Sequence, residues 1–305
     1  MPLPRSTTSS TLPHLGFIGI GLMGDPLSRR LAEAGHPLTL YNRTRAKAEA
    51  VAADTGARVA DSVAELTAEV DVILSCVANT KVLREVMLGS DGVIARARPG
   101  QRIIDMTSAD PAATRELAQA ASEAGVSWVD APVSGGVAGA EAGSLAIMCG
   151  GDAADVEAAR EVLAPLASRI THMGPVGSGQ VTKLCNQLLV GCTTAAIAEM
   201  VALAEASGVD ASRLPDALAG GFADSTPFRM LTPRMASRDF EAPSWHLRTL
   251  LKDVDMATAQ GHRQSSATPM AALAAQLMRS RLARGEGEKD PATLIRLYRD
   301  DDAQH

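Results

Sequence analysis

The chain has 305 residues, of which 46% are hydrophobic and only 3% aromatic, and its formal net charge at pH 7 is −6. A chain of this length can bury a large core and is long enough for about two domains. The composition is typical of a helix-rich α/β protein, and the acidic balance argues against nucleic acid as the main partner.

Residues 1–14 contain no apolar segment of the kind found in signal peptides, so they are predicted to form a disordered leader. Four cysteines, Cys76, Cys149, Cys185 and Cys192, lie in apolar surroundings without C-x-x-C spacing. They are predicted to be reduced core residues, which favours a cytoplasmic protein.

An apolar strand at residues 15–20 runs directly into a glycine-rich turn, and a helix to about residue 34 and a strand at 37–42 follow. A dinucleotide-binding fingerprint requires this order, because its glycines allow a tight turn, close approach to the pyrophosphate and packing of helix on strand. The alternative is that the glycines form only a turn. The predicted cofactor-binding residues of this turn are Gly19, Ile20, Gly21, Leu22, Met23 and Gly24.

The second strand ends in Asn42, Arg43 and Thr44, where an NAD site usually carries an acidic residue for the ribose 2′-hydroxyl. Arg43 can pair with a 2′-phosphate and Thr44 can donate a hydrogen bond to it. These three residues therefore predict NADP in preference to NAD, unless they are simply solvated residues after a strand.

Alternation of strands and helices continues to about residue 175. Further strands are predicted at 69–79, 101–109, 125–136 and 145–151, with a loop at 137–145 and a helix at 111–124. Asp110 and Pro111 supply a plausible N-cap and first turn for that helix. The pattern predicts a dinucleotide-binding domain at 15–175, built on a doubly wound, mostly parallel sheet.

Ligands of such sheets bind at the carboxyl ends of the strands, where this chain carries several polar residues. Val77, Ala78 and Asn79 end the third strand and are predicted to face the cofactor. The segment Ser134, Gly135 and Gly136 can form a small anion-binding nest for a carboxylate, or an ordinary turn.

The pattern changes at about residue 176. A long helix is predicted at 179–206, ended by Gly208, and further helices at 212–220, 247–260, 267–284 and 291–299. The second domain, 176–305, is therefore predicted to be all-helical. Residues 188–206 are apolar almost all round, which favours a buried helix or a subunit interface over a membrane span, and hence a homodimer or homotetramer.

Lys183 lies near the start of this long helix and shares one face with Asn186 and Gln187. A second lysine, Lys252, occurs in a later apolar helix. Composition alone favours a solvated surface position for Lys183, whereas its place after the cofactor domain favours a role in the site. The six histidines show no ligand spacing, so no metal site is predicted.

Four ordered motifs, GFIGIGLMG (16–24), DAPVSGG (130–136), GSGQVTKLCNQ (177–187) and LKD (251–253), resemble those of the β-hydroxyacid dehydrogenases. This family includes 3-hydroxyisobutyrate dehydrogenase and tartronate semialdehyde (2-hydroxy-3-oxopropionate) reductase. The resemblance covers residues 15 to about 300. It implies a Rossmann-type domain followed by an all-helical domain, and NADP-dependent interconversion of a small 3-hydroxy acid and its carbonyl compound.

The resemblance also implies roles for single residues. Lys183 matches the family's catalytic lysine, which would exchange the hydroxyl proton if burial lowers its pKa from about 10.4. Asn186 and Gln187 would orient this lysine or the substrate. The segment Ser134, Gly135 and Gly136 matches the substrate carboxylate site, while Ser108 and Lys252 match cofactor contacts.

The pair Asn186-Gln187 and the segment GGFADS (220–225) resemble the tartronate semialdehyde reductase branch, but Asp224 and Trp245 depart from the usual pattern. A dehydrogenase of another β-hydroxy acid, such as serine, threonine or threonate, therefore stays possible. An imine reductase-like enzyme and a non-catalytic NADP-binding protein are further alternatives, although both are expected to lack Lys183.

Overall fold

The structure is a computed structural model that describes residues 12–241, 243 and 245–299. The chain divides into two compact units, Met1–Gln180 and Val181–His305. Residues 1–11 of the predicted leader lie outside the described residues, whereas His14 is held by hydrogen bonds to the side chains of Asp71 and Thr39.

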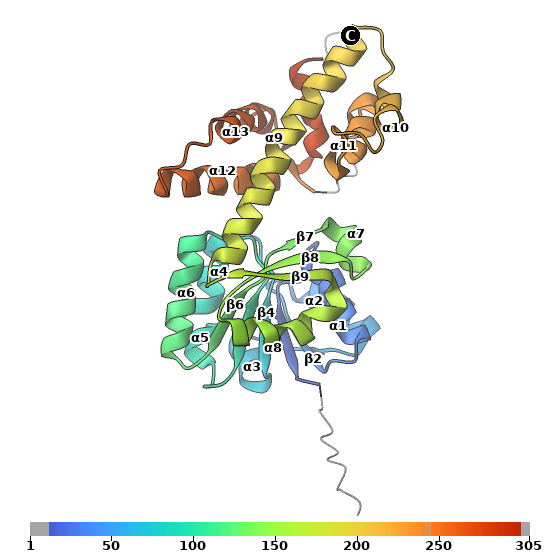
Figure 1. Ribbon diagram of the computed structural model, residues 1–305. Helices are drawn as coiled ribbons and strands as arrows, with labels where there is room; N and C mark the ends of the chain where they lie inside the picture. The colour runs from blue at the N-terminus through green and yellow to red at the C-terminus, as the bar shows by residue number, and fades with distance from the viewer. Residues whose placement is uncertain (1–11, 242, 244, 300–305) are drawn as a thin grey trace, which may run out of the picture. The chain divides into compact units, whose positions relative to one another are not determined.

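The first unit contains one sheet, in which nine strands of the described chain take part (Figure 1). The strands are β1 (Leu15–Ile18), β2 (Leu38–Tyr41), β3 (Arg58–Val59), β4 (Val72–Ser75), β5 (Arg102–Asp105), β6 (Ser127–Asp130), β7 (Val133–Ser134), β8 (Leu145–Gly150) and β9 (Ala167–Gly174). Their order is β3-β2-β1-β4-β5-β6-β8-β7, with β9 beside β8. Strands β1 to β6 run parallel, while β8 is antiparallel to both β6 and β7. The predicted doubly wound parallel sheet is confirmed.

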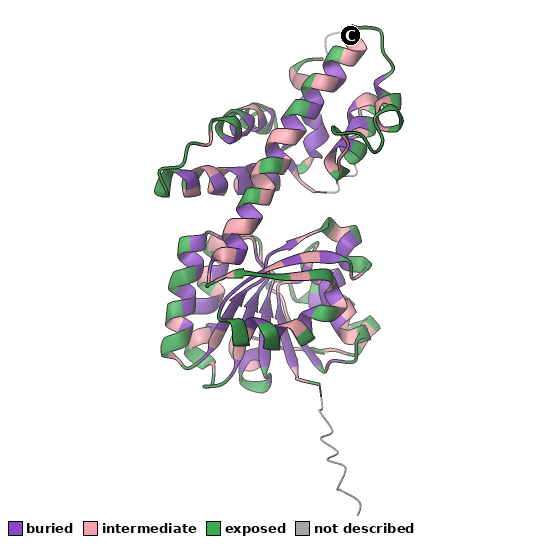
Figure 2. Ribbon diagram, in the orientation of Figure 1, coloured by how far each residue is buried: buried purple, intermediate pink, exposed green. Residues whose placement is uncertain are grey.

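Helices cover both faces of this sheet, as Figure 1 shows. They are α1 (Gly24–Glu33), α2 (Arg45–Thr55), α3 (Val63–Glu69), α4 (Thr80–Leu88), α5 (Val93–Arg96), α6 (Pro111–Glu123), α7 (Gly136–Glu141) and α8 (Ala153–Leu163). Successive strand residues point to opposite faces. Phe17 therefore joins the core beneath α1, α2 and α8, whereas Ile18 joins the core beneath α3, α4 and α6. The central strands β1, β4, β5 and β6 are buried on both faces, as the purple ribbon of Figure 2 shows.

Local sequence accounts for several helix ends. Asp110 accepts the N–H groups of Ala112 and Ala113 at the start of α6, and Pro111 occupies its first turn, as predicted.

Two elements of the first unit differ from the prediction. The predicted loop at 137–145 is wrong, because most of it forms α7. Strand β9 was not predicted either, since its side chains are largely exposed and it lacks an apolar run.

The described residues of the second unit contain helices and no strand. The helices are α9 (Ser178–Ala206), which begins in the first unit, α10 (Leu214–Ala217), α11 (Thr226–Ser237), α12 (Leu247–Arg263) and α13 (Pro269–Leu282). Residues 291–299 were predicted as an α-helix, but Pro291–Leu297 is a 3₁₀ helix capped by Asp290. Helix α11 was not predicted, because prolines stand both at its start and inside it.

Helix α9 is the one described helix that is long and apolar enough to cross a membrane, judged by length and composition alone. Core helices of soluble proteins pass the same test. Here Ala198 and Val201 are fully buried in the helical core, whereas Leu189 and Leu203 are 66% and 69% exposed. Cys185 on the same helix is exposed, so the prediction that all four cysteines are core residues is wrong for it.

A buried ionic network closes the C-terminal part of the second unit. Glu286 accepts hydrogen bonds from Arg281 and Arg296, both at 2.6 Å, and the side chains of Arg281 and Glu286 are 3% and 6% exposed. Burial opposes ionisation of Glu286, but the two arginines outweigh it and hold the pKa of this carboxyl below its usual range. The network therefore fixes α13 against the two 3₁₀ segments that follow it, Glu286–Glu288 and Pro291–Leu297.

We expect Glu286→Gln to lower the free energy of unfolding by about 3–5 kcal/mol, because it leaves buried guanidinium charge without its counter-ion. Urea unfolding followed by circular dichroism measures the change. Asp91→Asn removes an exposed partner of Arg96 and serves as the control with little expected effect. Equal stability of the two variants would contradict the stabilising role of Glu286 in the buried network.

Candidate active site

The carboxyl ends of five parallel strands meet at one edge of the sheet. Tyr41, Ile18, Ser75, Asp105 and Asp130 are the last residues of β2, β1, β4, β5 and β6, and each pairs with its neighbour across the sheet. The loops that follow these strands therefore start at the same level. Most of the predicted cofactor residues lie in these loops, at the edge where doubly wound sheets bind their ligands.

The three glycines of the fingerprint turn differ in what surrounds them. Gly19 has φ +103°, and a Cβ there would lie 2.4 Å from the carbonyl oxygen of Cys76. A Cβ on Gly24 would lie 1.9 Å from the carbonyl oxygen of Gly19. A Cβ on Gly21 would meet no protein atom within 4 Å. The fold itself thus requires the first and third glycines, while the second leaves the open space that a dinucleotide pyrophosphate needs.

Asn42 connects this turn to the loop after β2. Its Oδ1 accepts the N–H of Ile20 at 3.0 Å, and its Nδ2 donates to the carbonyl oxygen of Thr44 at 2.9 Å. The side chain thereby fixes the fingerprint turn and the predicted phosphate-binding loop relative to each other.

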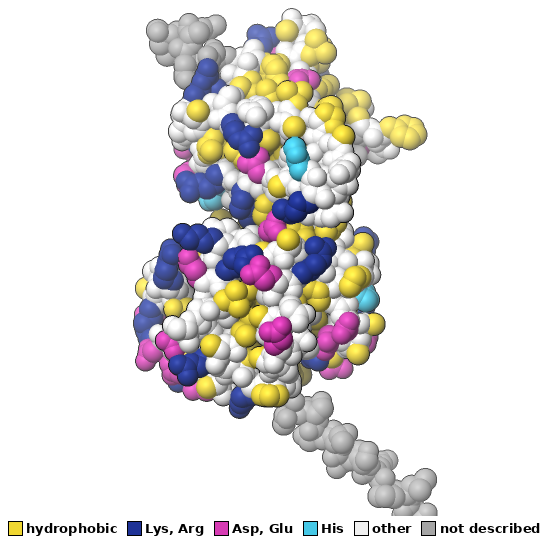
Figure 3. All heavy atoms as spheres, turned by 90° about the vertical axis from the view of Figure 1, so that its left-hand side faces the viewer, with side chains coloured by type: hydrophobic (Ala, Val, Ile, Leu, Met, Phe, Trp, Pro, Cys, Tyr) yellow, Lys and Arg dark blue, Asp and Glu magenta, His cyan; other side chains and the backbone are white. Residues whose placement is uncertain are grey.

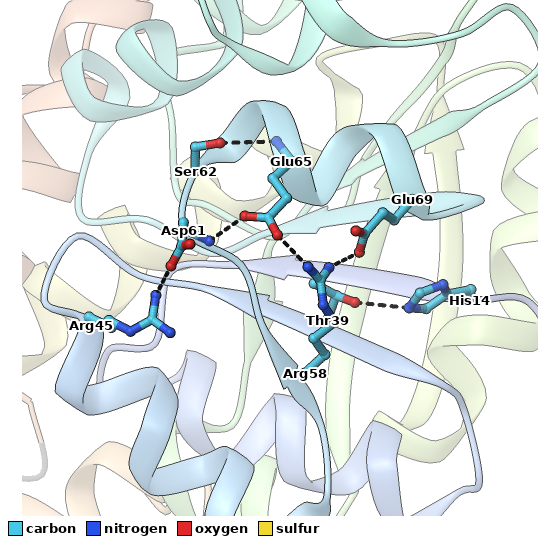
Figure 4. Close-up of polar contacts among 8 residues, drawn as sticks. All are labelled: His14, Thr39, Arg45, Arg58, Asp61, Ser62, Glu65 and Glu69. Carbon is cyan, nitrogen blue, oxygen red and sulfur yellow. Dashed lines mark hydrogen bonds and ion pairs between the residues drawn. The ribbon is translucent and has the colours of Figure 1, made fainter.

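Arg43 lies in this loop, whereas Arg45 begins α2 and points toward Asp61 (Figure 4). Arg45 pairs with Glu49 and Asp61, so its charge is already neutralised. Arg43 is exposed and has no ion pair with any residue that the structure describes. Arg43 is therefore the better placed of the two to meet a phosphate. On the face of the first unit drawn in Figure 3, charges of both signs are interspersed.

The loops after β4 and β5 are joined by Thr107, whose Oγ1 accepts the N–H of Val77 at 3.0 Å. Asn79 caps α4 by accepting the N–H of Val82, so its carbonyl oxygen is already engaged. Ser108 follows Thr107 and is half-buried. These contacts bring together the loops that carry two of the predicted cofactor segments.

The predicted carboxylate segment follows β7. Ser134 pairs with Ala146 of β8, and the next two residues have positive φ angles, +135° at Gly135 and +64° at Gly136. A Cβ on Gly135 would also lie 2.9 Å from the side chain of Leu145. Glycine is therefore required here by conformation and space, and α7 begins at Gly136.

Within the second unit, the predicted polar residues form a hydrogen-bonded chain with Asp253. Gln187 donates to Oδ2 of Asp253 at 2.7 Å, and its Oε1 accepts the amide of Asn186 at 2.8 Å. Lys252 Nζ lies 3.2 Å from the other oxygen of Asp253. Sequence reasoning did not assign a role to Asp253, although a carboxylate in an apolar helix is a signal for one.

Lys183 is buried, which excludes the solvated surface position favoured by composition. Burial lowers the pKa of its ammonium below the ordinary value of 10.5, an effect that Asp253 opposes and Lys252 reinforces. The second unit thus contains a buried lysine that can change protonation state, together with fixed amide groups. Among the described residues, no group of three His, Cys, Asp or Glu side chains could hold a metal ion.

Comparison with known families agrees with this arrangement. The family described as the NAD binding domain of 6-phosphogluconate dehydrogenase matches residues 14–174, and that described as NAD-binding of NADP-dependent 3-hydroxyisobutyrate dehydrogenase matches residues 177–298. The chain belongs to the β-hydroxyacid dehydrogenase family. As a family member it is an NAD(P)-dependent dehydrogenase acting on CH–OH groups, with a small hydroxy acid as substrate, and the predicted resemblance is confirmed.

Characterised members similar to this chain differ in substrate. The 2-hydroxy-3-oxopropionate reductase of Escherichia coli is 34% identical over 281 residues, which cover 92% of this chain and 95% of that protein. The NAD-dependent L-serine dehydrogenase of Pseudomonas aeruginosa is 32% identical over 294 residues, covering 94% and 98%. The structure of Mycobacterium tuberculosis 3-hydroxyisobutyrate dehydrogenase with L-serine has a TM-score of 0.86 and 31% identity, covering 95% and 100%. Family membership therefore leaves both the substrate and the choice between NADP and NAD open.

The fingerprint turn generates a paired prediction. We expect Gly21→Ala to keep the melting temperature of the wild type and to weaken NADPH binding by about tenfold or more, because its methyl group occupies cofactor space. Gly24→Ala should instead lower the melting temperature, since its methyl group overlaps the backbone. Thermal unfolding and fluorescence titration with NADPH measure the two effects. A Gly21→Ala variant with unchanged affinity would contradict the assignment.

Proposed function

We propose that the protein is an NADP-dependent dehydrogenase of a small 3-hydroxy carboxylic acid, of the 2-hydroxy-3-oxopropionate reductase or 3-hydroxyisobutyrate dehydrogenase type. The observation that carries this proposal is the burial of Lys183, on one helix face with Asn186 and Gln187. A buried lysine with a lowered pKa can serve as the general base that alcohol dehydrogenation requires.

The protonation state of Lys183 determines the direction in which it transfers a proton. In oxidation of the hydroxy acid, neutral Lys183 would accept the hydroxyl proton, and a bound nicotinamide would supply the hydride acceptor. In reduction, the ammonium form of Lys183 returns the proton to the carbonyl oxygen. Lowering of the pKa by burial increases the fraction of neutral amine near neutral pH, which benefits the oxidative direction.

Other residues of this chain would orient the substrate. Ser134 and the following two glycines would hold its carboxylate. Because Gln187 is fixed by Asp253, its carbonyl oxygen in turn fixes the amide of Asn186. The carbonyl oxygen of Asn186 would then be left for the Lys183 ammonium or for a substrate hydroxyl.

The choice of NADP rests on Arg43 and Thr44. Arg43 keeps its charge for a 2′-phosphate, and Asn42 fixes the loop that carries both residues. The second unit includes Lys252, which would lie at the nicotinamide ribose.

Within the family, Gln187 favours the 2-hydroxy-3-oxopropionate reductase branch. The two departures from that branch do not add a free charge. Asp224 accepts the N–H of Gly220 in its own loop and pairs with Arg229 of α11 at 3.2 Å, so its carboxylate already has partners nearby in the chain. Trp245 packs against the core of the helical unit. Serine and other β-hydroxy acids are the alternative substrates, because a similar protein is named for L-serine.

We expect Lys183→Ala to lower kcat by about 10²–10⁴-fold while NADPH still binds. The substrate is chosen first by testing 3-hydroxyisobutyrate, glycerate, serine, threonine and threonate separately with NADP. In the wild type, kcat for oxidation should rise with pH, with the midpoint of the rise below pH 10.5, since the neutral amine is the active form.

Lys183→Arg is the matched variant, because it keeps the positive charge but cannot act as a base near neutral pH. It should be as inactive as Lys183→Ala. Near-normal turnover of either variant would show that another group exchanges the proton.

A second paired prediction tests cofactor choice. We expect Arg43→Ala to raise KM for NADP by about 10–100-fold, with little effect on KM for NAD, because one charge-assisted contact to the 2′-phosphate is lost. Arg45→Ala is the control, since the guanidinium of Arg45 is occupied by Glu49 and Asp61. Steady-state kinetics with both cofactors gives the values. A wild type with higher kcat/KM for NAD would reject the NADP assignment.

A further inference from the structure

The first turn of helix α9 is capped by a carboxylate from a distant strand. Asp130 ends β6 and is fully buried. Its Oδ1 accepts the N–H of Gly177 at 2.7 Å, and its Oδ2 accepts the N–H of Gln180 at 2.9 Å. The first N–H groups of a helix have no partner within the helix, so this carboxylate supplies the cap that Gly177 lacks a side chain to provide.

Glycines allow the helix start to approach this closely. A Cβ on Gly150 would lie 2.6 Å from Asp130 Oδ1, and a Cβ on Gly179 would lie 2.3 Å from the carbonyl oxygen of Met148. The first turn of α9 is therefore packed against the backbone of β8 and the side chain of Asp130, with no room for movement toward either.

Gln180 adds a second attachment in the same turn. Its side chain is buried, donates to the carbonyl oxygen of Thr107 at 2.7 Å and accepts the N–H of Ala109 at 3.0 Å. These two residues flank Ser108. One amide group thus holds both the helix start and the loop predicted to contact the cofactor.

We propose that Asp130 and Gln180 are positioning residues for Lys183. Gln180 and Lys183 are three residues apart in one continuous helix, so they share a face and are separated by about 4.5 Å along the axis. Fixing the first turn therefore fixes the lysine in the next. This inference rests on the proposed role of Lys183 as the proton-exchanging group.

The chain offers a matched control for Gln180. Gln101 is equally buried and bridges backbone groups at the opposite end of β5. It donates to the carbonyl oxygens of Thr67 and Val70 at 2.8 and 2.6 Å and accepts the N–H of Arg98. Gln101→Ala and Gln180→Ala therefore remove comparable buried bridges from the same unit, and only Gln180→Ala touches the start of α9.

We expect Gln180→Ala to lower kcat by about 10–100-fold and to move the rising limb of the pH profile to higher pH, because Lys183 becomes more hydrated. Gln101→Ala should lose thermal stability without moving this limb. Asp130→Asn, which turns a donor toward one of the two helix N–H groups, should shift the limb as well and leave KM for NADP within about twofold. It provides an independent test if one variant does not fold.

A second readout needs no turnover. Brief acetylation at several pH values, followed by mass spectrometry of the peptide that contains Lys183, reports the protonation and access of this amine. We expect the limiting rate of labelling at high pH, which reports access, and the apparent pKa of Lys183 both to be higher in Gln180→Ala and Asp130→Asn than in the wild type or Gln101→Ala. If no hydroxy acid is oxidised but the labelling changes as stated, the proposed function fails and the positioning role stands. Unchanged labelling and pH limb in both variants, or an equal shift in Gln101→Ala, would overturn the positioning role.

Discussion

The contact between Asp130 and the first turn of α9 is the constraint on which the arrangement of the motifs depends. Burial raises the pKa of Asp130, and the helix N–H groups that it accepts oppose this effect. The carboxylate belongs to the segment 130–136 and the N–H groups to the segment 177–187, so two of the family motifs meet at one contact. This close approach explains Gly179 of the second segment and Gly150 of β8, with no reference to a ligand. The same two segments carry Ser134, which is proposed to bind the substrate carboxylate, and Lys183, which is proposed to exchange the hydroxyl proton.

The buried carboxylates Asp105 and Asp130 of the first unit differ in how many of their oxygens accept hydrogen bonds. Asp105 lies beside Asp130 in the sheet and accepts hydrogen bonds from Ser75 and Thr107, but its Oδ2 has no hydrogen-bond partner among the described residues. Burial raises the pKa of Asp105 to about 7, and the neighbouring Asp130 adds to this effect. Two adjacent buried carboxyls are tolerated because one is held by a helix start and the other can take up a proton near neutral pH.

Periodicity and glycine placement predicted the parallel sheet, the fingerprint turn and the long helix, because these features are local in sequence. They did not predict α7, which is short, β9, whose side chains are exposed, or α11, which contains prolines, because each of these features removes the local pattern. The site was predicted less completely. Composition favoured a solvated Lys183, and only the fold shows that it is buried. The roles of Asp130, Gln180 and Asp253 come from contacts over 47 to 73 residues of chain, which no local pattern encodes.

The pair Asn186-Gln187 has a physical meaning beyond family resemblance. An asparagine at 187 would withdraw the amide by about one carbon–carbon bond, ~1.5 Å, and would open its 2.7 Å hydrogen bond to Asp253. Asp253 would then keep its ion pair with Lys252 but lose the hydrogen bond from residue 187. Its negative charge would still favour the protonated form of Lys183. By donating to one carboxylate oxygen, Gln187 fixes the position of the carboxylate that favours the protonated form of Lys183. The residue that distinguishes branches of the family is therefore coupled to the acid–base state of the lysine on which the proposed chemistry depends.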